Sequence, residues 1–125
     1  MIRAILPVFV ALAATSAAAE SGNAPSAGER AFQKCYACHS LEGPDPGPQG
    51  PSLKGIVGRA VAAEPGFRYS PALRTLAARQ RVWNRETLDA FIADPQAAAP
   101  GNEMGFFGMR DAAERRALIE YLDKP

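Results

Sequence analysis

The sequence has few of the side chains from which metal and redox sites are usually built. Its 125 residues include two cysteines and one histidine. A tetrahedral zinc site needs four ligands, usually Cys or His, so a structural zinc site in this chain would lack its fourth soft ligand. A metal ion held by two histidines of the same chain is excluded as well.

The chain also lacks a strong excess of charge of either sign. Its formal net charge is +1, and Lys34, Lys54 and Lys124 are its only lysines beside eleven arginines. Domains that bind nucleic acid usually carry a clear basic excess. We therefore expect no nucleic-acid partner.

The first residues have the composition of a secretory signal peptide, which we assign to residues 1–19. Arg3 supplies the positive start, residues 5–14 the apolar segment, and residues 17–19 an A-x-A cleavage site. The alternative is an uncleaved membrane anchor, but the apolar segment is shorter than the roughly 20 residues that cross a bilayer. We therefore expect export to the periplasm and cleavage, which leaves one domain over residues 20–125.

The two cysteines and the histidine lie together in Cys35-Tyr36-Ala37-Cys38-His39, which reads C-x-x-C-H. This is the attachment pattern of a c-type haem. Two thiols three positions apart, at the end of a helix, can each add to one vinyl group of the same porphyrin. The histidine is then held beneath the iron, where an imidazole nitrogen can ligate it.

A thiol-redox site is the main alternative for a C-x-x-C sequence. Such a site places the two cysteines between a strand and a helix of a βαβ unit, and no strand pattern precedes Cys35. We therefore interpret the motif as a covalent haem site with His39 as an iron ligand. Because the chain has no second histidine, a sixth ligand would be a methionine.

Capping signals and apolar spacing predict four helices and no strand. Ser26 and Glu29 form a capping box, Ser70-Pro71 is a favourable helix start, and Asn84 and Asp111 are suitable N-caps. The first helix is expected to pack against the last. Gly28 is explained either by a close crossing of these two helices or by its place near a helix start. The predicted helices run from about Ala27 to Cys35, from Pro71 to about Arg79, from Asn84 to Pro95, and from Asp111 past Leu122.

The remaining segments are predicted to be irregular. Residues 43–51 hold four prolines and three glycines, which indicates a rigid loop. Residues 52–69 show no clean period, and residues 95–110 form a second predicted loop. A loop that starts just after His39 would wall the iron-binding side. There we expect a hydrogen bond from His39 Nδ1–H to the Pro51 carbonyl, which would orient the ring.

In their order along the chain, these pieces resemble the class I c-type cytochromes, the small carriers of bacteria and mitochondria. The likeness covers nearly all of residues 20–125. It implies an all-α cytochrome c fold of about four helices, with loops wrapping one covalently bound haem c. The matching pieces are residues 28–32, 35–39, 50–53 with 55–59, 66–70 and 100–108, Trp83 with Leu88 and Pro95, and the helix that carries residues 118–122.

The resemblance also implies how the haem is held. Cys35 and Cys38 would form the thioethers, and His39 and Met104 would be the two iron ligands. Met104 follows Pro-Gly in the late loop, whereas Met109 lies next to the last helix and is expected to pack in the core.

Further positions match residues that surround the haem in this family. Arg59, Tyr69 and Trp83 match side chains that neutralise or hydrogen-bond a buried propionate. Phe91 occupies a site where close relatives often carry a tyrosine near the iron-bound sulfur. The missing hydroxyl would alter the surroundings of the sulfur and with them the reduction potential.

The implied function is that of an electron carrier and not of an enzyme. The protein would be soluble and monomeric, without stable membrane insertion after cleavage. It would pass single electrons between membrane oxidase or reductase complexes, or from periplasmic dehydrogenases. The alternatives are a peroxidase-like haem protein, a small dehydrogenase subunit, or a sensor for NO or CO. Peroxidase and sensor functions both need an open or displaceable iron position, which Met104 would block.

The charge pattern leads to a prediction about kinetics. Mitochondrial relatives carry several lysines around the exposed haem edge, whereas the matching loop here contains Gln96, Ala97 and Glu103 and leaves Lys34 and Arg110. Because electrostatic steering depends on strong complementary fields, we expect the association rate with the redox partner to depend little on ionic strength. Stopped-flow mixing at low and high salt measures this rate, and a steep fall with added salt would contradict the prediction.

Overall fold

The computed structural model describes residues 22–43, 47 and 49–125. The predicted signal peptide lies outside these residues, as does part of the predicted loop over residues 43–51. The all-α prediction is confirmed, since the described residues form helices and one isolated antiparallel bridge between Ala60 and Val82. None of these helices has the length and apolar character needed to cross a membrane. The helices are α1 (Ala27–Phe32), α2 (Pro71–Arg79), α3 (Arg85–Ala93), α4 (Pro95–Ala98) and α5 (Ala112–Leu122).

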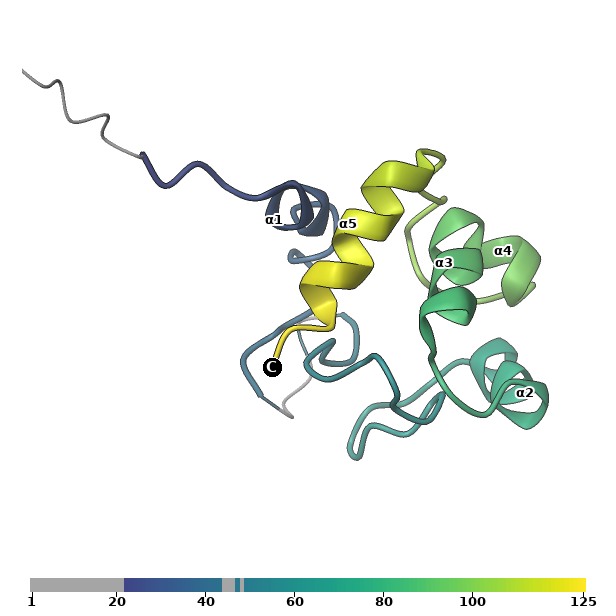
Figure 1. Cartoon of the computed structure of the whole chain (residues 1–125). Coiled ribbons are helices and arrows are strands. Elements are labelled where there is room, and N and C mark those ends of the chain that lie inside the picture. Colours follow the sequence, from purple (N-terminus) through teal and green to yellow (C-terminus); the bar gives the residue numbers. More distant parts are fainter. Residues whose placement is uncertain (1–21, 44–46, 48) are drawn as a thin grey trace, which may run out of the picture.

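Helices α1 and α5 cross one another, and α3 and α4 lie on the other side of α5 (Figure 1). The crossing of α1 and α5 is close at Gly28. A Cβ atom at this position would lie 2.4 Å from Tyr121 Cβ and 2.6 Å from the Ala117 carbonyl oxygen. The Phe32 ring packs beside it, 5.8 Å from the ring of Tyr121. Close packing, and not merely a position near the helix start, therefore explains Gly28.

Helix α1 begins at the predicted capping box but ends earlier than predicted. The Ser26 hydroxyl accepts from the Glu29 amide, and the Glu29 carboxylate accepts from the Ser26 amide. After Phe32 the chain continues in tight turns, in which the His39 amide donates to the Cys35 carbonyl at 3.0 Å. The C-x-x-C-H motif is therefore wound directly onto the end of α1.

The predicted starts of α2, α3 and α5 are confirmed. Ser70, Asn84 and Asp111 each accept a hydrogen bond from the amide three residues later. Each side chain satisfies an amide at the helix N-terminus that has no partner within the helix.

The prediction of a continuous loop over residues 95–110 was wrong at its start. Residues Pro95–Ala98 form the single turn α4, whose N-cap Asp94 accepts from the Ala97 amide at 3.0 Å. Proline ends α3 because it has no amide hydrogen, and it opens α4 because its fixed φ suits a first helical position. The remaining loop is tied to α3 by a bond from the Met109 amide to the Ile92 carbonyl, at 2.8 Å.

The irregular segment after Pro51 is fastened to the chain just before α3. The Gly58 amide donates to the Trp83 carbonyl, and the Trp83 amide donates to the Arg59 carbonyl, at 2.6 and 2.9 Å. These bonds place Arg59 beside the buried Trp83. The core also contains Met109, as predicted, which is 2% exposed. Its other large members are Phe32, Ile56, Leu76, Leu88, Leu118, Ile119 and Leu122.

The α1–α5 crossing yields a test of packing. Gly28→Ala would force a methyl group into space held by Tyr121 and by backbone of α5. Because overpacking of this kind costs typically 1–3 kcal/mol, we expect the free energy of unfolding to fall by about 2 kcal/mol in a denaturant titration.

Gly22→Ala is the matched control, since no atom lies within 4 Å of the Cβ it would add. An unchanged stability in Gly28→Ala would show that the two helices separate easily and that their close crossing is not a constraint on the fold.

Candidate haem site

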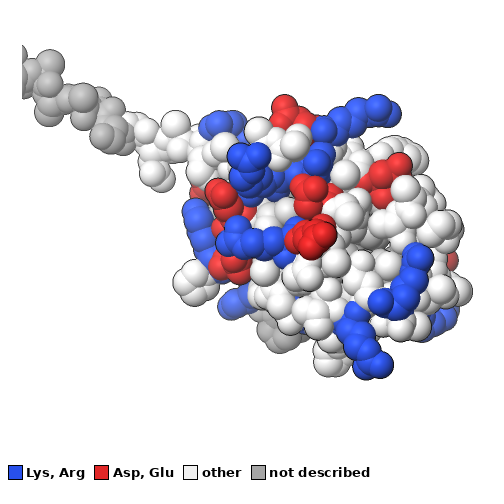
Figure 2. All heavy atoms as spheres, turned by 45° about the vertical axis from the view of Figure 1, so that its right-hand side comes forward, with Lys and Arg blue, Asp and Glu red and all other residues white. Residues whose placement is uncertain are grey.

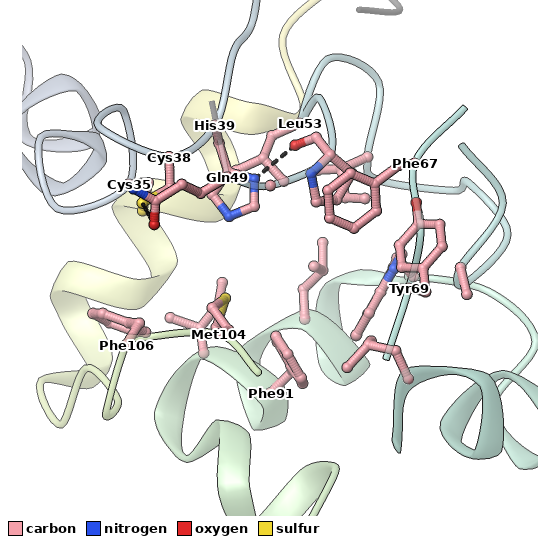
Figure 3. A pocket seen from close by; sticks show the side chains of 18 of the residues that line it. Cys35, Cys38, His39, Gln49, Leu53, Phe67, Tyr69, Phe91, Met104 and Phe106 are labelled. Carbon is pink, nitrogen blue, oxygen red and sulfur yellow. Dashed lines mark hydrogen bonds between the residues drawn. The ribbon is translucent and has the colours of Figure 1, made fainter. Parts of the chain in front are cut away.

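The eight residues predicted to bind the haem lie around one cavity. Its volume is about 270 Å³, and it lies between the C-x-x-C-H motif, the irregular segment after it, α3 and the loop that follows α4 (Figure 3). Most of the remaining lining is apolar, so the cavity suits a flat apolar group with few polar substituents. The predicted residues that line it are Cys35, Cys38, His39, Pro51, Arg59, Tyr69, Trp83 and Met104.

His39 is held in one orientation by the backbone opposite it. Its Nδ1 lies 2.6 Å from the Pro51 carbonyl oxygen, so the predicted contact is present. An imidazole that donates from Nδ1 keeps the lone pair of Nε2 for a metal. Figure 3 shows this second nitrogen directed into the cavity, toward the wall that carries Met104.

Burial and nearby charges act in opposite directions on His39. Burial lowers the pKa of the imidazole, while the bond to Pro51 and the charge of Glu64 raise it and the charge of Arg59 lowers it. The net effect is a lowered pKa. The ring is therefore neutral at physiological pH, which is the state that ligates a metal.

Two glycines let the loop that follows the motif approach it closely. A Cβ atom at Gly50 would lie 2.5 Å from His39 Cε1 and 2.7 Å from His39 Nδ1. A Cβ atom at Gly47 would lie 2.4 Å from the Cys38 carbonyl oxygen. Side chains at these positions would displace the imidazole or the motif backbone.

Cys35 does not have the lowered pKa of an attacking redox thiol. Both cysteines are free. Burial is the main cause that raises the pKa of Cys35 to about 11. The charge of Lys34 lowers this pKa, and that of Cys38 raises it further. Thiol-redox sites instead lower the pKa of their attacking thiol. In addition, no cluster of three or more potential metal ligands from His, Cys, Asp and Glu occurs in the described part of the chain.

Met104 is held on the opposite wall by an asparagine that sequence reasoning missed. Asn102 is 6% exposed, and its Oδ1 accepts from the Met104 amide at 3.0 Å. Its Nδ2 donates to the carbonyls of Pro95 and Ala99, at 2.9 and 3.0 Å. The short helix α4 therefore sets the position of Met104. The only signal for this role in the sequence was that Asn102 is a polar residue between Pro100-Gly101 and Met104.

Arg59 and Tyr69 bring polar groups to the side of the cavity near Trp83. Arg59 donates from Nη2 to the Ser52 carbonyl at 2.5 Å. Tyr69 Oη accepts from the Glu64 amide at 3.0 Å, a bond that does not use its own hydroxyl proton. Burial is the largest cause that raises the pKa of Tyr69, so the hydroxyl stays protonated and can donate. Such donors suit a carboxylate substituent of a bound group.

The phenylalanine at position 91 also lies where the sequence placed it. Phe91 lines the cavity on the side of α3 and packs edge-on against Trp83, with the ring centroids 5.0 Å apart and the planes at 60°. No hydroxyl is therefore offered to the cavity from this position.

Two buried polar residues behind His39 were also missed. Ser52 is fully buried and Glu64 is 6% exposed. The Ser52 amide donates to Glu64 Oε2 at 2.6 Å, and the Ser52 hydroxyl donates to the Gly43 carbonyl at 2.5 Å. Glu64 is the one acidic residue between positions 46 and 85. This is a weak signal for a buried role, because burial cannot be inferred from residue spacing in an irregular segment.

Comparison with known proteins identifies the family. The model of the family described as cytochrome c matches residues 25–124, so the chain belongs to the cytochrome c family. It is 41% identical over 98 residues to the cytochrome c-type cyt cy of Rhodobacter capsulatus, a match that covers 78% of this chain and 47% of that protein. The chain therefore spans about half the length of this relative.

Two other relatives match over most of their length. Cytochrome c2 of Rhodoplanes tepidamans is 39% identical over 93 residues, which is 74% of this chain and 92% of that protein. The solved structure of cytochrome cH from Methylobacterium extorquens superposes with a TM-score of 0.68 at 37% identity, over 77% of this chain and 93% of that chain.

These matches confirm the fold and the cofactor that the sequence predicted. The chain has the cytochrome c fold and belongs to a family of electron-transport proteins with one covalently bound haem c. The cavity fits this group, because it offers two free thiols, an oriented neutral imidazole, a thioether on the facing wall and an apolar lining.

The contact between Gly50 and His39 can be tested directly. Gly50→Ala would add a methyl group where the imidazole lies, and the ring would have to leave the Pro51 carbonyl. We expect less haem per protein in the purified product and an unfolding free energy lower by about 2 kcal/mol, as overpacking and a lost hydrogen bond both contribute.

The haem absorbance per mole of protein and a denaturant titration measure the two effects. Gly22→Ala again serves as the control, because its added Cβ meets no atom within 4 Å. Normal haem content and normal stability in Gly50→Ala would mean that the close approach of this loop does not fix the ring.

Proposed function

We propose that the protein carries single electrons between redox proteins of the periplasm, on a haem c joined to Cys35 and Cys38 and ligated by His39 and Met104. The observation that supports this best is the arrangement of one oriented imidazole and one thioether on facing walls of the same apolar cavity. Haem c, when bound, supplies a one-electron couple between ferrous and ferric iron.

Each of the two proposed ligand residues is held by a hydrogen bond to another part of the chain. The Pro51 carbonyl fixes the ring of His39, and Asn102 fixes the backbone of Met104. Ligands held in this way change little between two oxidation states, which favours electron transfer over binding of a substrate. This arrangement speaks against the peroxidase and sensor alternatives, both of which need an open or displaceable iron position.

The proposed propionate contacts lie on the side of Trp83. Tyr69 and Arg59 both line the cavity, and Arg59 is already oriented by its bond to the Ser52 carbonyl. A carboxylate buried near these groups would be both hydrogen-bonded and neutralised, which offsets the cost of its burial.

The proposed partners are membrane oxidase or reductase complexes or periplasmic dehydrogenases, met by a monomer after the signal peptide is removed. Figure 2 shows basic and acidic side chains interspersed on one face, with uncharged surface between them. Lys34, at the cavity, is paired with Glu114 at 2.5 Å.

Phe107, three residues after Met104, is 90% exposed. Apolar contact near the Met104 loop would therefore contribute more to docking than long-range attraction.

The assignment of Met104 is tested by comparing two methionine substitutions. We expect Met104→Leu to lose the weak ferric absorption band at the red end of the spectrum that is typical of Met–iron coordination. The reduced variant should also bind CO, which the wild-type protein should not. Absorption spectra of the oxidised protein, and of the reduced protein with and without CO, measure both effects.

Met109→Leu is the matched control, because it makes the same chemical change at a residue that is 2% exposed in the core. A volume-conserving exchange of this kind usually costs below about 1.5 kcal/mol, and the spectrum should not change. If Met104→Leu kept the wild-type band, or if wild-type protein bound CO readily, the proposal of a sealed electron carrier would be wrong.

A further inference from the structure

The peptide group between Pro51 and Ser52 is hydrogen-bonded on both of its sides. Its carbonyl oxygen lies 2.6 Å from His39 Nδ1. Its amide nitrogen lies 2.6 Å from Glu64 Oε2. Because the C=O of Pro51 and the N–H of Ser52 belong to one planar amide, a continuous path of hydrogen bonds joins the Glu64 carboxylate to the imidazole.

The Ser52–Glu64 end of this path is buried, and the backbone on both sides of it makes further hydrogen bonds. Ser52 is fully buried and Glu64 is 6% exposed. The Ser52 carbonyl accepts from Arg59 Nη2 at 2.5 Å, and the Glu64 amide donates to Tyr69 Oη at 3.0 Å. The backbones of Ser52 and Glu64 are therefore held by further bonds, and the bond from the Ser52 amide holds the carboxylate itself.

Packing alone does not explain a carboxylate at this position. Glu64 Oε1 is buried and has no hydrogen-bond partner among the described residues. Leaving such an atom unsatisfied costs free energy that an apolar side chain of similar size would avoid. The position is therefore expensive for stability, which calls for a contribution to something other than stability.

A negative charge at the amide end of the path changes the carbonyl end. A charged acceptor makes a hydrogen bond roughly twice as strong as a neutral one, and hydrogen bonds in series polarise one another, more so at low dielectric. The Pro51 carbonyl oxygen then becomes a stronger acceptor for His39 Nδ1–H. An imidazole that shares its Nδ1 proton more fully is a stronger electron donor through Nε2.

We propose that Glu64 is a positioning residue that strengthens His39 as an iron ligand through the Pro51–Ser52 peptide, and thereby favours ferric iron and lowers the reduction potential. This inference rests on the proposed function, since it takes His39 as the proximal ligand. It assigns to Glu64 a role in setting the potential that is distinct from holding the haem.

Two variants of the holoprotein separate the path from a simple effect of charge. E64Q removes the charge but keeps an oxygen that can accept from the Ser52 amide. E64D keeps the charge but shortens the side chain, which withdraws it from the Ser52 amide. We expect the potential to be higher than wild type in both variants at the same pH, in a spectroelectrochemical titration.

Hydrogen exchange in the reduced protein gives a readout that is independent of the potential. We expect the His39 Nδ1 proton and the Ser52 amide proton to exchange faster in E64Q, by a factor on the order of ten, because a charged acceptor has been replaced by a neutral one. The Met109 amide, bonded to the Ile92 carbonyl on another part of the molecule, is the reference and should keep its rate.

The outcomes are distinct. A wild-type potential in E64Q would overturn the proposal. A second contrary outcome is a raised potential in E64Q together with a wild-type potential and wild-type exchange in E64D. The charge of Glu64 would then act through space and not through the peptide. If E64Q did not fold, the potential and exchange of E64D would decide in the same way. If E64Q failed to raise the potential while keeping the Met–iron band, the proposed carrier function would stand without this role for Glu64. Absence of a haem spectrum in wild type would overturn both.

Discussion

The hydrogen bond between His39 and the Pro51 carbonyl is the contact on which the organisation of this molecule depends. It selects the tautomer of the imidazole, and it joins the motif to the loop that follows it. The loop can make this bond because Gly47 and Gly50 let its backbone approach the motif at distances that no side chain would allow. Through Ser52 the same peptide reaches Glu64 and Arg59, so hydrogen bonds connect the residues behind the proposed iron ligand His39.

On the cavity wall that carries Met104, a buried polar side chain also fixes the loop backbone. There Asn102 bonds the backbone of Met104 on one side, and the Pro95 and Ala99 carbonyls at the two ends of α4 on the other. The helices contribute few polar groups to the cavity. Their main contribution is the close α1–α5 crossing, which holds the motif in place. In each wall a buried polar side chain fixes irregular backbone, which is how loops can present ligands with the constancy that electron transfer requires.

How far the sequence predicted this structure depends on whether the signal was local. The capping residues Ser26, Ser70, Asn84 and Asp111 act on amides three positions away, so the helix starts could be predicted. The C-x-x-C-H motif is equally local. Helix α4 was missed because proline was taken only as a stop. Asn102 and Glu64 were missed because their roles come from burial and from partners that irregular backbone brings close, which no periodicity encodes.

The distribution of charge makes physical sense when the surface and the interior are compared. On the face drawn in Figure 2, charges of both signs occur near one another. Lys34 is paired with Glu114, which weakens the field of that lysine at a distance. Beside His39, Glu64 is buried and Arg59 is half-buried, and the pKa of His39 responds to both charges. A buried charge is screened less than an exposed one, so it acts more strongly on a neighbour at the same distance. The buried charge of Glu64 thus lies close to the proposed iron ligand, which is where the proposed effect on the potential requires it.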